Sequence, residues 1–212
     1  NFTGIKCTKN IINACKIHPV SWFISVHTTS CFSKYQSLSA TYNEIEQFVF
    51  SSGVDYTLIR PTMIYGSSKD RNMWKLLRFI SRYKFFPVFG RGENLLQPIH
   101  AKDLGEAVYA IFLCNKASVN KAYNVAGKSV MTYKELLETV SKKLNRKVYF
   151  IYIPFFISIL LVKFYSVISK KPYITIEQVM RVNEDKNFDY SEATQDFGFS
   201  PMSFDEGIDS EI

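Results

Sequence analysis

One stretch of the chain, Val54–Gly66, constrains the fold more than any other. Its apolar, β-branched residues run into Arg60-Pro61 and close on Gly66, a pattern that predicts a buried strand over 54–60 followed by a tight loop. Because proline has no N–H to donate, the strand must end at Pro61. Ligands of open α/β sheets bind at the carboxyl ends of the strands, so this segment is a candidate binding element. An ordinary core strand that ends at a proline would show the same pattern.

Helices and strands alternate around this stretch. The pattern predicts a helix over 4–17, a strand over 21–26, a second helix over 39–52 and then the strand at 54–60. Short connections in the order α, β, α, β are typical of a parallel sheet covered by helices. We therefore predict an α/β fold.

The rest of the chain continues with mixed elements. The expected helices are 70–83 with Asp70 as its cap, 104–114 begun by Asp103, 133–144 capped at Thr132, and an apolar helix from Pro154 to about Ser169. The expected strands are 85–89, 96–100, 123–127 and 148–153, with a turn at 90–94. Residues 197–201 form the expected last turn of the chain.

Composition excludes several classes of function. The 212 residues carry a formal charge of +7, but the basic residues are scattered, so the sequence does not predict nucleic-acid binding. The four cysteines show no CxxC spacing and the three histidines lie far apart, so we expect no metal site. Reduced thiols and a cytoplasmic location are the expectation. Residues 148–168 are almost uncharged, but Pro154 and Lys163 interrupt them; membrane association is possible but not favoured.

A set of short motifs resembles a known family when it is taken in order. The motifs are Asn1-x-x-Gly4, His27-Thr28-Thr29-Ser30, Gly53-x-Asp55-Tyr56-x-x-x-Arg60-Pro61, Gln97-x-x-His100-x-x-Asp103, Tyr123-Asn124-Val125-x-Gly127, and Gly198-Phe199-x-Pro201 before Glu206-Gly207. Each motif alone is common, but this order and spacing resemble the second half of an extended short-chain dehydrogenase/reductase of the NAD-dependent epimerase/dehydratase family.

The resemblance implies a Rossmann-like parallel sheet that binds NAD or NADP, with a small C-terminal α/β substrate region. Residues 1–130 would form a partial NAD(P)-binding domain with interleaved substrate-region segments, and residues 131–212 a substrate or cap region. The family's glycine-rich turn, which cradles the pyrophosphate, is not found in the 212 residues. We therefore expect the chain to be a fragment, with an in-frame upstream extension that encodes this turn.

The resemblance also assigns site residues. In this family a Tyr acts as general acid/base beside a Lys four residues later on one helix. Alignment on Glu46 puts Leu38 at the Tyr position and Tyr42 at the Lys position, whereas Thr28 keeps the family's hydroxyl position. Thr28 is therefore the one catalytic candidate. A separate Tyr65-x-x-x-Lys69 pair is expected to lie in a loop.

Other family positions imply binding roles. The cofactor-binding candidates are Asn1, His27, Thr28, Pro61, Thr62, Met63 and Ile64, and the substrate-binding candidates are Arg91, Gln97 and His100. Leu96 stands where sugar-nucleotide epimerases carry a diphosphate-binding Arg, so a nucleotide-sugar substrate is in doubt unless Arg91 compensates. His100 and Asp103 could equally have structural roles.

Two functions remain open at this point. The first is an NAD(P)-dependent oxidoreductase or isomerase acting on a small carbonyl or hydroxyl compound. The alternative is a catalytically inactive NAD(P)H-binding scaffold, similar to the accessory subunit of respiratory NADH dehydrogenase that has this fold. The sequence does not distinguish NAD from NADP, and it indicates neither the substrate nor the oligomeric state.

Overall fold

The computed structural model describes residues 2–18, 20–67, 70, 72–169 and 175–212. The chain divides into two compact units, each of which is described by itself. Unit 1 contains the chain up to Thr62 together with Lys102–Ala126 and Phe188–Pro201. Unit 2 contains Met63–Ala101, Gly127–Asn187 and Met202–Ile212.

Unit 1 is built on a parallel sheet of three strands in the order β1-β2-β7. These are β1 (Phe23–Val26), β2 (Tyr56–Pro61) and β7 (Lys121–Val125). Val26 pairs with Ile59, and Pro61 pairs with Val125, so all three strands end at the same edge. The predicted parallel α/β fold is confirmed, and β2 ends at the proline where the sequence requires it to stop.

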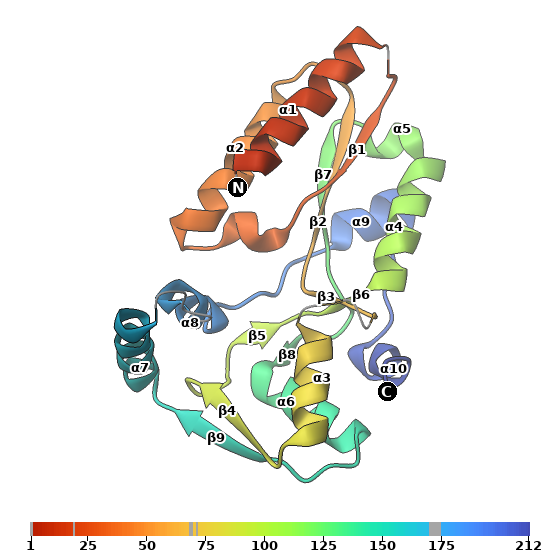
Figure 1. Ribbon diagram of the computed structural model, residues 1–212. Coiled ribbons are helices and arrows are strands. Elements are labelled where there is room, and N and C mark those ends of the chain that lie inside the picture. The colour runs from red at the N-terminus through yellow and green to blue at the C-terminus, as the bar shows by residue number, and fades with distance from the viewer. Residues whose placement is uncertain (1, 19, 68–69, 71, 170–174) are drawn as a thin grey trace. The chain divides into compact units, whose positions relative to one another are not determined.

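Helices cover both faces of this sheet, as Figure 1 shows. One side carries α1 (Phe2–Ile17) and α2 (Gln36–Phe50); the other carries α4 (Ala101–Leu113) and α9 (Ser191–Phe197). The short helix α5 (Asn115–Ser118) follows α4, and a 3₁₀ helix, η1 (Thr29–Phe32), follows β1. The prediction that Asp103 caps α4 is wrong: the helix begins at Ala101, and Asp103 is buried within its first turn.

Unit 2 contains three two-stranded ribbons. The pairs are β3 (Ile64–Tyr65) with β6 (Ile99–His100), β4 (Phe85–Phe89) with β9 (Tyr149–Ile153), and β5 (Leu95–Leu96) with β8 (Met131–Thr132). Its helices are α3 (Met73–Arg82), α6 (Tyr133–Lys143), α7 (Phe155–Ile168), α8 (Ile176–Val182) and α10 (Phe204–Asp209). One apolar core joins α3, α6 and α10, with Ile80, Leu136 and Phe204 almost fully buried.

Local signals explain where these elements begin. The Asp70 carboxylate accepts hydrogen bonds from the N–H groups of Met73 and Trp74 at 2.7 and 3.0 Å, so it binds the first turn of α3 as expected, although the N-cap residue is Asn72. Thr132 and Glu135 form a capping box on α6. The prediction of a single strand over 96–100 is wrong, because Gln97-Pro98 separates β5 from β6.

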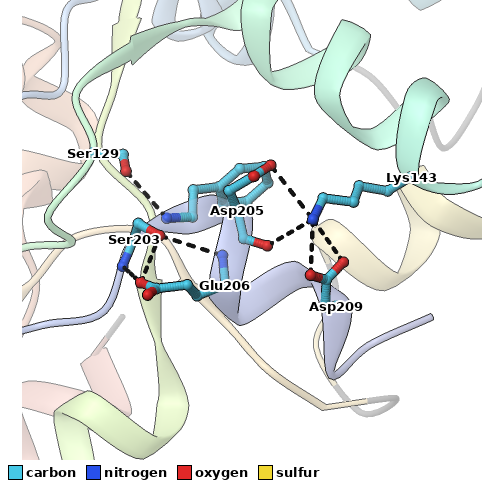
Figure 2. A network of polar contacts seen from close by, with 7 residues as sticks. Ser129, Lys143, Ser203, Asp205, Glu206 and Asp209 are labelled. Atoms are coloured by element: carbon cyan, nitrogen blue, oxygen red, sulfur yellow. Dashed lines mark hydrogen bonds and ion pairs between the residues drawn. The ribbon is translucent and has the colours of Figure 1, made fainter.

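The C-terminal helix α10 is held by a network of polar contacts (Figure 2). Ser203 and Glu206 form a capping box, and the N–H of Phe204 donates to Ser129 Oγ at 3.1 Å. The Lys143 ammonium donates to the Asp205 carbonyl and to the Asp209 carboxylate, at 3.1 and 2.8 Å. The Glu206 of the C-terminal motif therefore has a structural role in unit 2.

Gly127 shows a second structural role for a motif residue. A Cβ at this position would overlap the carbonyl oxygen of Pro98. The Gly127 carbonyl accepts a hydrogen bond from Gln97 Nε2 at 2.8 Å. Two backbone segments of unit 2 approach closely here, and glycine is the residue that permits it.

Candidate functional site

The carboxyl edge of the unit 1 sheet gathers four of the predicted site residues. The N–H of His27, just after β1, donates to the Ile59 carbonyl at 2.7 Å. The N–H of Thr62, just after β2, donates to the Val125 carbonyl at 3.1 Å. His27-Thr28 and Pro61-Thr62 thus extend beyond neighbouring strands at one edge, the position where ligands of such sheets bind.

A hydroxyl from the next residue fixes this edge. Thr29 is buried, and its Oγ1 donates to the Pro61 carbonyl at 3.3 Å. The bond ties the segment after β1 to the end of β2. Thr29 was not singled out from the sequence, because its contact partner lies in a different strand.

Thr28 is the N-cap of the 3₁₀ helix η1. Its Oγ1 accepts a hydrogen bond from the Ser30 N–H at 3.2 Å and lies 3.2 Å from Ser30 Oγ. The residue is half-buried and has extended backbone, with φ −161° and ψ 146°. A hydroxyl has one donor and two acceptor sites; Thr28 uses the donor on Ser30 Oγ and one acceptor site on the Ser30 N–H, which leaves one acceptor site.

A buried ion pair lies beside this edge, between α2 and β2. Arg60 donates from Nε and Nη2 to the two carboxylate oxygens of Glu46, at 2.8 and 2.7 Å. The two side chains are 13% and 6% exposed. His27 Nδ1 lies 3.8 Å from Glu46 Oε1, and both side chains are 6% exposed. The Arg60 guanidinium also lies over the Phe32 ring, with Cζ 5.2 Å from the ring centroid.

Burial sets the protonation of the groups around this pair. It lowers the pKa of His27, and the Arg60 charge adds to that, whereas Glu46 opposes it. His27 Nδ1 is buried and has no hydrogen-bond partner among the residues that the structure describes. Burial, followed by the Glu46 charge, raises the pKa of the Cys31 thiol to about 12. A neutral imidazole and a protonated thiol therefore flank the ion pair.

The sequence contained a signal for this cluster. Arg60 occurs in a strand expected to be buried, and a buried guanidinium requires a counter-charge. In the sequence, Glu46 was used only to align the chain with the family. The spacing of residues does not show that the fold of α2 and β2 places Glu46 beside Arg60.

The two positions to which the resemblance assigned a proton relay lie on α2. Leu38 and Tyr42 are four residues apart on this helix, and Tyr42 is half-buried. The expectation that Tyr65 lies in a loop is wrong: it ends β3, is 1% exposed and packs edge-on against His100 with 5.2 Å between ring centroids. Lys69 lies outside the described residues.

Unit 2 holds the remaining described candidates. Ile64 lies in β3 and is 36% exposed, and the Met63 carbonyl accepts from the Ile99 N–H at 3.0 Å. Gln97 is 3% exposed, and its side-chain amide nitrogen donates a hydrogen bond to the Gly127 carbonyl. His100 is half-buried at the end of β6, with Nε2 3.3 Å from Ser210 Oγ.

The turn before β5 contains Arg91 and an additional polar group. The Arg91 side chain is 86% exposed and forms a weak ion pair with Glu93 at 3.9 Å. Asn94 is 9% exposed, and within the described part of the chain neither its Oδ1 nor its Nδ2 has a hydrogen-bond partner. Sequence reasoning placed Asn94 in a turn and missed its buried amide. Asn1 lies outside the described residues.

The carboxyl edge of unit 1 combines groups of different chemistry. It offers backbone polar groups, the apolar ring of Pro61 and the half-buried Thr28 hydroxyl. Among the described residues, no group of three His, Cys, Asp or Glu side chains could hold a metal ion. The arrangement can position a ligand oxygen by hydrogen bonding at the carboxyl edge of a parallel sheet.

Comparisons with known proteins were made by sequence and by structure. No family model matches the chain. It is 29% identical over 111 residues to NADH dehydrogenase (ubiquinone) 1 alpha subcomplex subunit 9, mitochondrial, of Arabidopsis thaliana, covering 52% of this chain and 27% of that protein. It is 26% identical over 157 residues to N-acetyl-alpha-D-glucosaminyl-diphospho-ditrans,octacis-undecaprenol 4-epimerase of Escherichia coli O157:H7. This match covers 72% of this chain and 47% of the epimerase. The matches span less than half the length of these two relatives.

The structural comparison is more extensive. The crystal structure of UDP-glucuronic acid 4-epimerase from Bacillus cereus, in complex with UDP-glucuronic acid and NAD, matches with a TM-score of 0.75. The sequence identity is 16%, and the match covers 98% of this chain and 65% of the epimerase chain. The resemblance seen in the sequence motifs is confirmed: the chain has the Rossmann-like α/β fold of the NAD-dependent epimerase/dehydratase family.

Proposed function

We propose that this protein binds NAD or NADP and acts as an oxidoreductase or isomerase on a small carbonyl or hydroxyl compound. The observation that carries the proposal is the carboxyl edge of the parallel sheet, where Thr29 links the segment after β1 to the end of β2 and so positions Thr28 beside Pro61-Thr62. The nicotinamide cofactor, when bound, supplies hydride-transfer chemistry. The similar proteins include the 4-epimerase of Escherichia coli O157:H7 and the Bacillus cereus epimerase whose structure contains NAD.

Thr28 would orient the substrate oxygen in this proposal. Its hydroxyl accepts from the Ser30 N–H and donates to Ser30 Oγ at 3.2 Å, so a hydrogen bond to the substrate oxygen would replace the contact with Ser30 Oγ. Pro61, Thr62, Met63 and Ile64 would contact the cofactor through the segment that follows β2, and His27 would do so through the segment that follows β1. Neither Leu38 nor Tyr42 reproduces the Tyr/Lys pair, so the proton would have to move through another group.

The substrate is a narrower part of the proposal. Leu96, at the position of the diphosphate-binding Arg, is 7% exposed and belongs to the unit 2 core. An aliphatic side chain cannot replace a bidentate guanidinium. This favours a small substrate without a diphosphate, with Arg91, Gln97 and His100 as the candidate contacts. The free cysteines among the described residues are consistent with a cytoplasmic location, which is part of the proposal.

The test uses three variants of one hydroxyl pair. We expect Thr28→Val to lower turnover about 10²-fold, because the donor to the substrate oxygen is lost. Thr28→Ser should retain most activity, and Ser30→Ala is the matched control, since it removes the neighbouring hydroxyl and leaves Thr28 Oγ1 in place. Cofactor binding is measured separately by calorimetric titration with NADH and NADPH. Equal turnover of Thr28→Val and the unmodified protein would contradict the assigned role.

The alternative is a cofactor-holding scaffold without catalysis. It is favoured by Leu38, which can move no proton, and by the similarity to a subunit of mitochondrial NADH dehydrogenase. In that case calorimetry should show NADH or NADPH binding that Thr28→Val changes little. No carbonyl or hydroxyl compound should then be turned over with either cofactor.

A further inference from the structure

Helix α7 exposes an unusual amount of apolar surface. Phe156, Leu160, Leu161, Phe164 and Ile168 are between 53% and 72% exposed. Within the described side chains of this helix, Ser158 and Val162 are the buried ones. A soluble helix normally buries its apolar residues and exposes polar ones, and α7 reverses that pattern over most of its circumference.

The strand that leads into α7 extends this surface. Phe86 and Phe150 pack against the core of unit 2, so the alternate residues of β4 and β9 point away from it. Tyr149, Ile151 and Phe85 are 75%, 51% and 50% exposed on that outward face. We call Phe85, Tyr149, Ile151 and the five exposed α7 residues named above the apolar face.

Along the chain, the segment that contains α6's last turn, β9 and α7 has charges of one sign. From Thr139 to Ser169 the sequence contains no Asp or Glu, and its basic residues are Lys142, Lys143, Arg146, Lys147 and Lys163. Arg146 and Lys147 lie just before β9, are exposed, and form no ion pair with any other residue that the structure describes. Lys163 projects from α7 itself and is exposed.

Basic residues also precede the partner strand. Arg82 and Lys84 are exposed, and the Lys84 carbonyl accepts a hydrogen bond from the Tyr149 N–H at 2.8 Å. Both strands of the β4–β9 ribbon therefore begin beside positive charge. The acidic residues that bound the acid-free segment are otherwise engaged: Glu138 pairs with Lys134 at 3.9 Å, and Glu177 Oε1 is buried.

We propose that the apolar face binds the surface of an anionic lipid bilayer. At 14 residues, α7 is about 21 Å long by its helical rise, which is short of the roughly 30 Å needed to span the hydrocarbon core. In the described part of the chain, no helix is long and apolar enough to cross a membrane. Phe, Leu and Ile side chains would insert at the headgroup boundary while Lys163 extends its ammonium to the phosphates.

The charge pattern selects the lipid surface over other occupants. A second copy of this chain would bring the same basic border against itself, which is repulsive. An anionic bilayer supplies both an apolar layer and a negative headgroup layer, and these match the apolar face and its basic border. The apolar face and the carboxyl edge of unit 1 have no residue in common, so the proposal does not depend on the proposed activity.

Vesicle flotation tests the proposal. The purified protein is mixed with vesicles of phosphatidylcholine alone or of phosphatidylcholine with phosphatidylglycerol. We expect flotation with the anionic vesicles, weakened by at least about tenfold in Leu160→Glu/Phe164→Glu, because two anchors are lost and negative charge is added. Arg146→Ser/Lys147→Ser should weaken it about fivefold for each charge removed, an effect that high salt should mimic.

A matched control comes from an exposed apolar pair on another helix. Tyr109 and Phe112 on α4 are each 64% exposed, so Tyr109→Glu/Phe112→Glu makes the same chemical change elsewhere and should leave flotation unchanged. Thermal unfolding of each variant checks that it is folded. Absence of flotation with anionic vesicles, or equal loss in the control, overturns the proposal. Self-association that Leu160→Glu/Phe164→Glu abolishes, without vesicle binding, would assign the apolar face to a second copy instead.

Discussion

The ion pair between Glu46 and Arg60 gives the most informative stability prediction. Both side chains are largely buried, at 6% and 13% exposed, and they share two hydrogen bonds of 2.8 and 2.7 Å. Glu46→Gln preserves the shape but retains one acceptor, so it loses one charged hydrogen bond of about 1.5–3 kcal/mol. It also leaves the guanidinium without a counter-charge. Breaking a buried pair in this way costs about 3–5 kcal/mol in total, and we expect that loss in the free energy of unfolding.

The assay uses tryptophan fluorescence during urea unfolding. The two tryptophans lie in different units: Trp22 donates to Thr57 Oγ1 at 3.0 Å in unit 1, and Trp74 lies in α3 of unit 2. In a Trp74→Phe background, Trp22 reports on unit 1 alone.

A double variant separates the pair from its individual charges. Glu46→Leu/Arg60→Met replaces both charges by apolar groups and should be within about 1 kcal/mol of the parent, since no charge is left buried. A loss below about 1 kcal/mol for Glu46→Gln would show that the pair behaves like a solvated surface pair and would refute the reasoning.

Three further predictions follow from burial. Burial lowers the pKa of His27 from its ordinary value of 6.5, so the unfolded chain binds the proton at a higher pH than the folded chain does. The free energy of unfolding should therefore fall as the pH drops below about 6.5. His27→Gln should flatten this pH dependence in urea titrations from pH 7 to 5. The pKa of Cys31, about 12, should keep it unalkylated by iodoacetamide at pH 8 while exposed Cys7 reacts, as peptide mass spectrometry would show. Gly127→Ala should lower the thermal stability of unit 2 by about 1–3 kcal/mol through its backbone clash, whereas Gly105→Ala, where a Cβ meets nothing within 4 Å, should be neutral or stabilising.

Local signals in the sequence predicted much of the fold. The β2 strand followed from its apolar run and the missing N–H of Pro61, and α6 followed from the Thr132–Glu135 capping box. These features depend on residues within a few positions of one another. The two-residue strands β3, β5, β6 and β8 were not predicted as such, because a pair of residues has no periodicity.

The candidate site was less predictable, because its contacts join distant segments. Thr28 was assigned by resemblance, but its cap on η1 and the bond from Thr29 to Pro61 required the structure. The same holds for the Glu46–Arg60 pair, which joins α2 to β2. Asn94 appeared to be an ordinary turn residue, and its buried, unpaired amide depends on how unit 2 packs.

The buried polar groups of unit 1 bear on the choice between enzyme and scaffold. The contacts of Glu46, Arg60 and Thr29 fix α2, β2 and the segment after β1, and none of these contacts involves Leu38 or Tyr42. A chain that loses the Tyr/Lys pair can therefore retain the geometry of the carboxyl edge. Under the proposed function, cofactor binding and catalysis would be separable, because the first would depend on the edge and the second on a proton path. For this reason, retained cofactor binding alone would not establish an enzyme, and the Thr28 variants must be assayed for turnover as well as for binding.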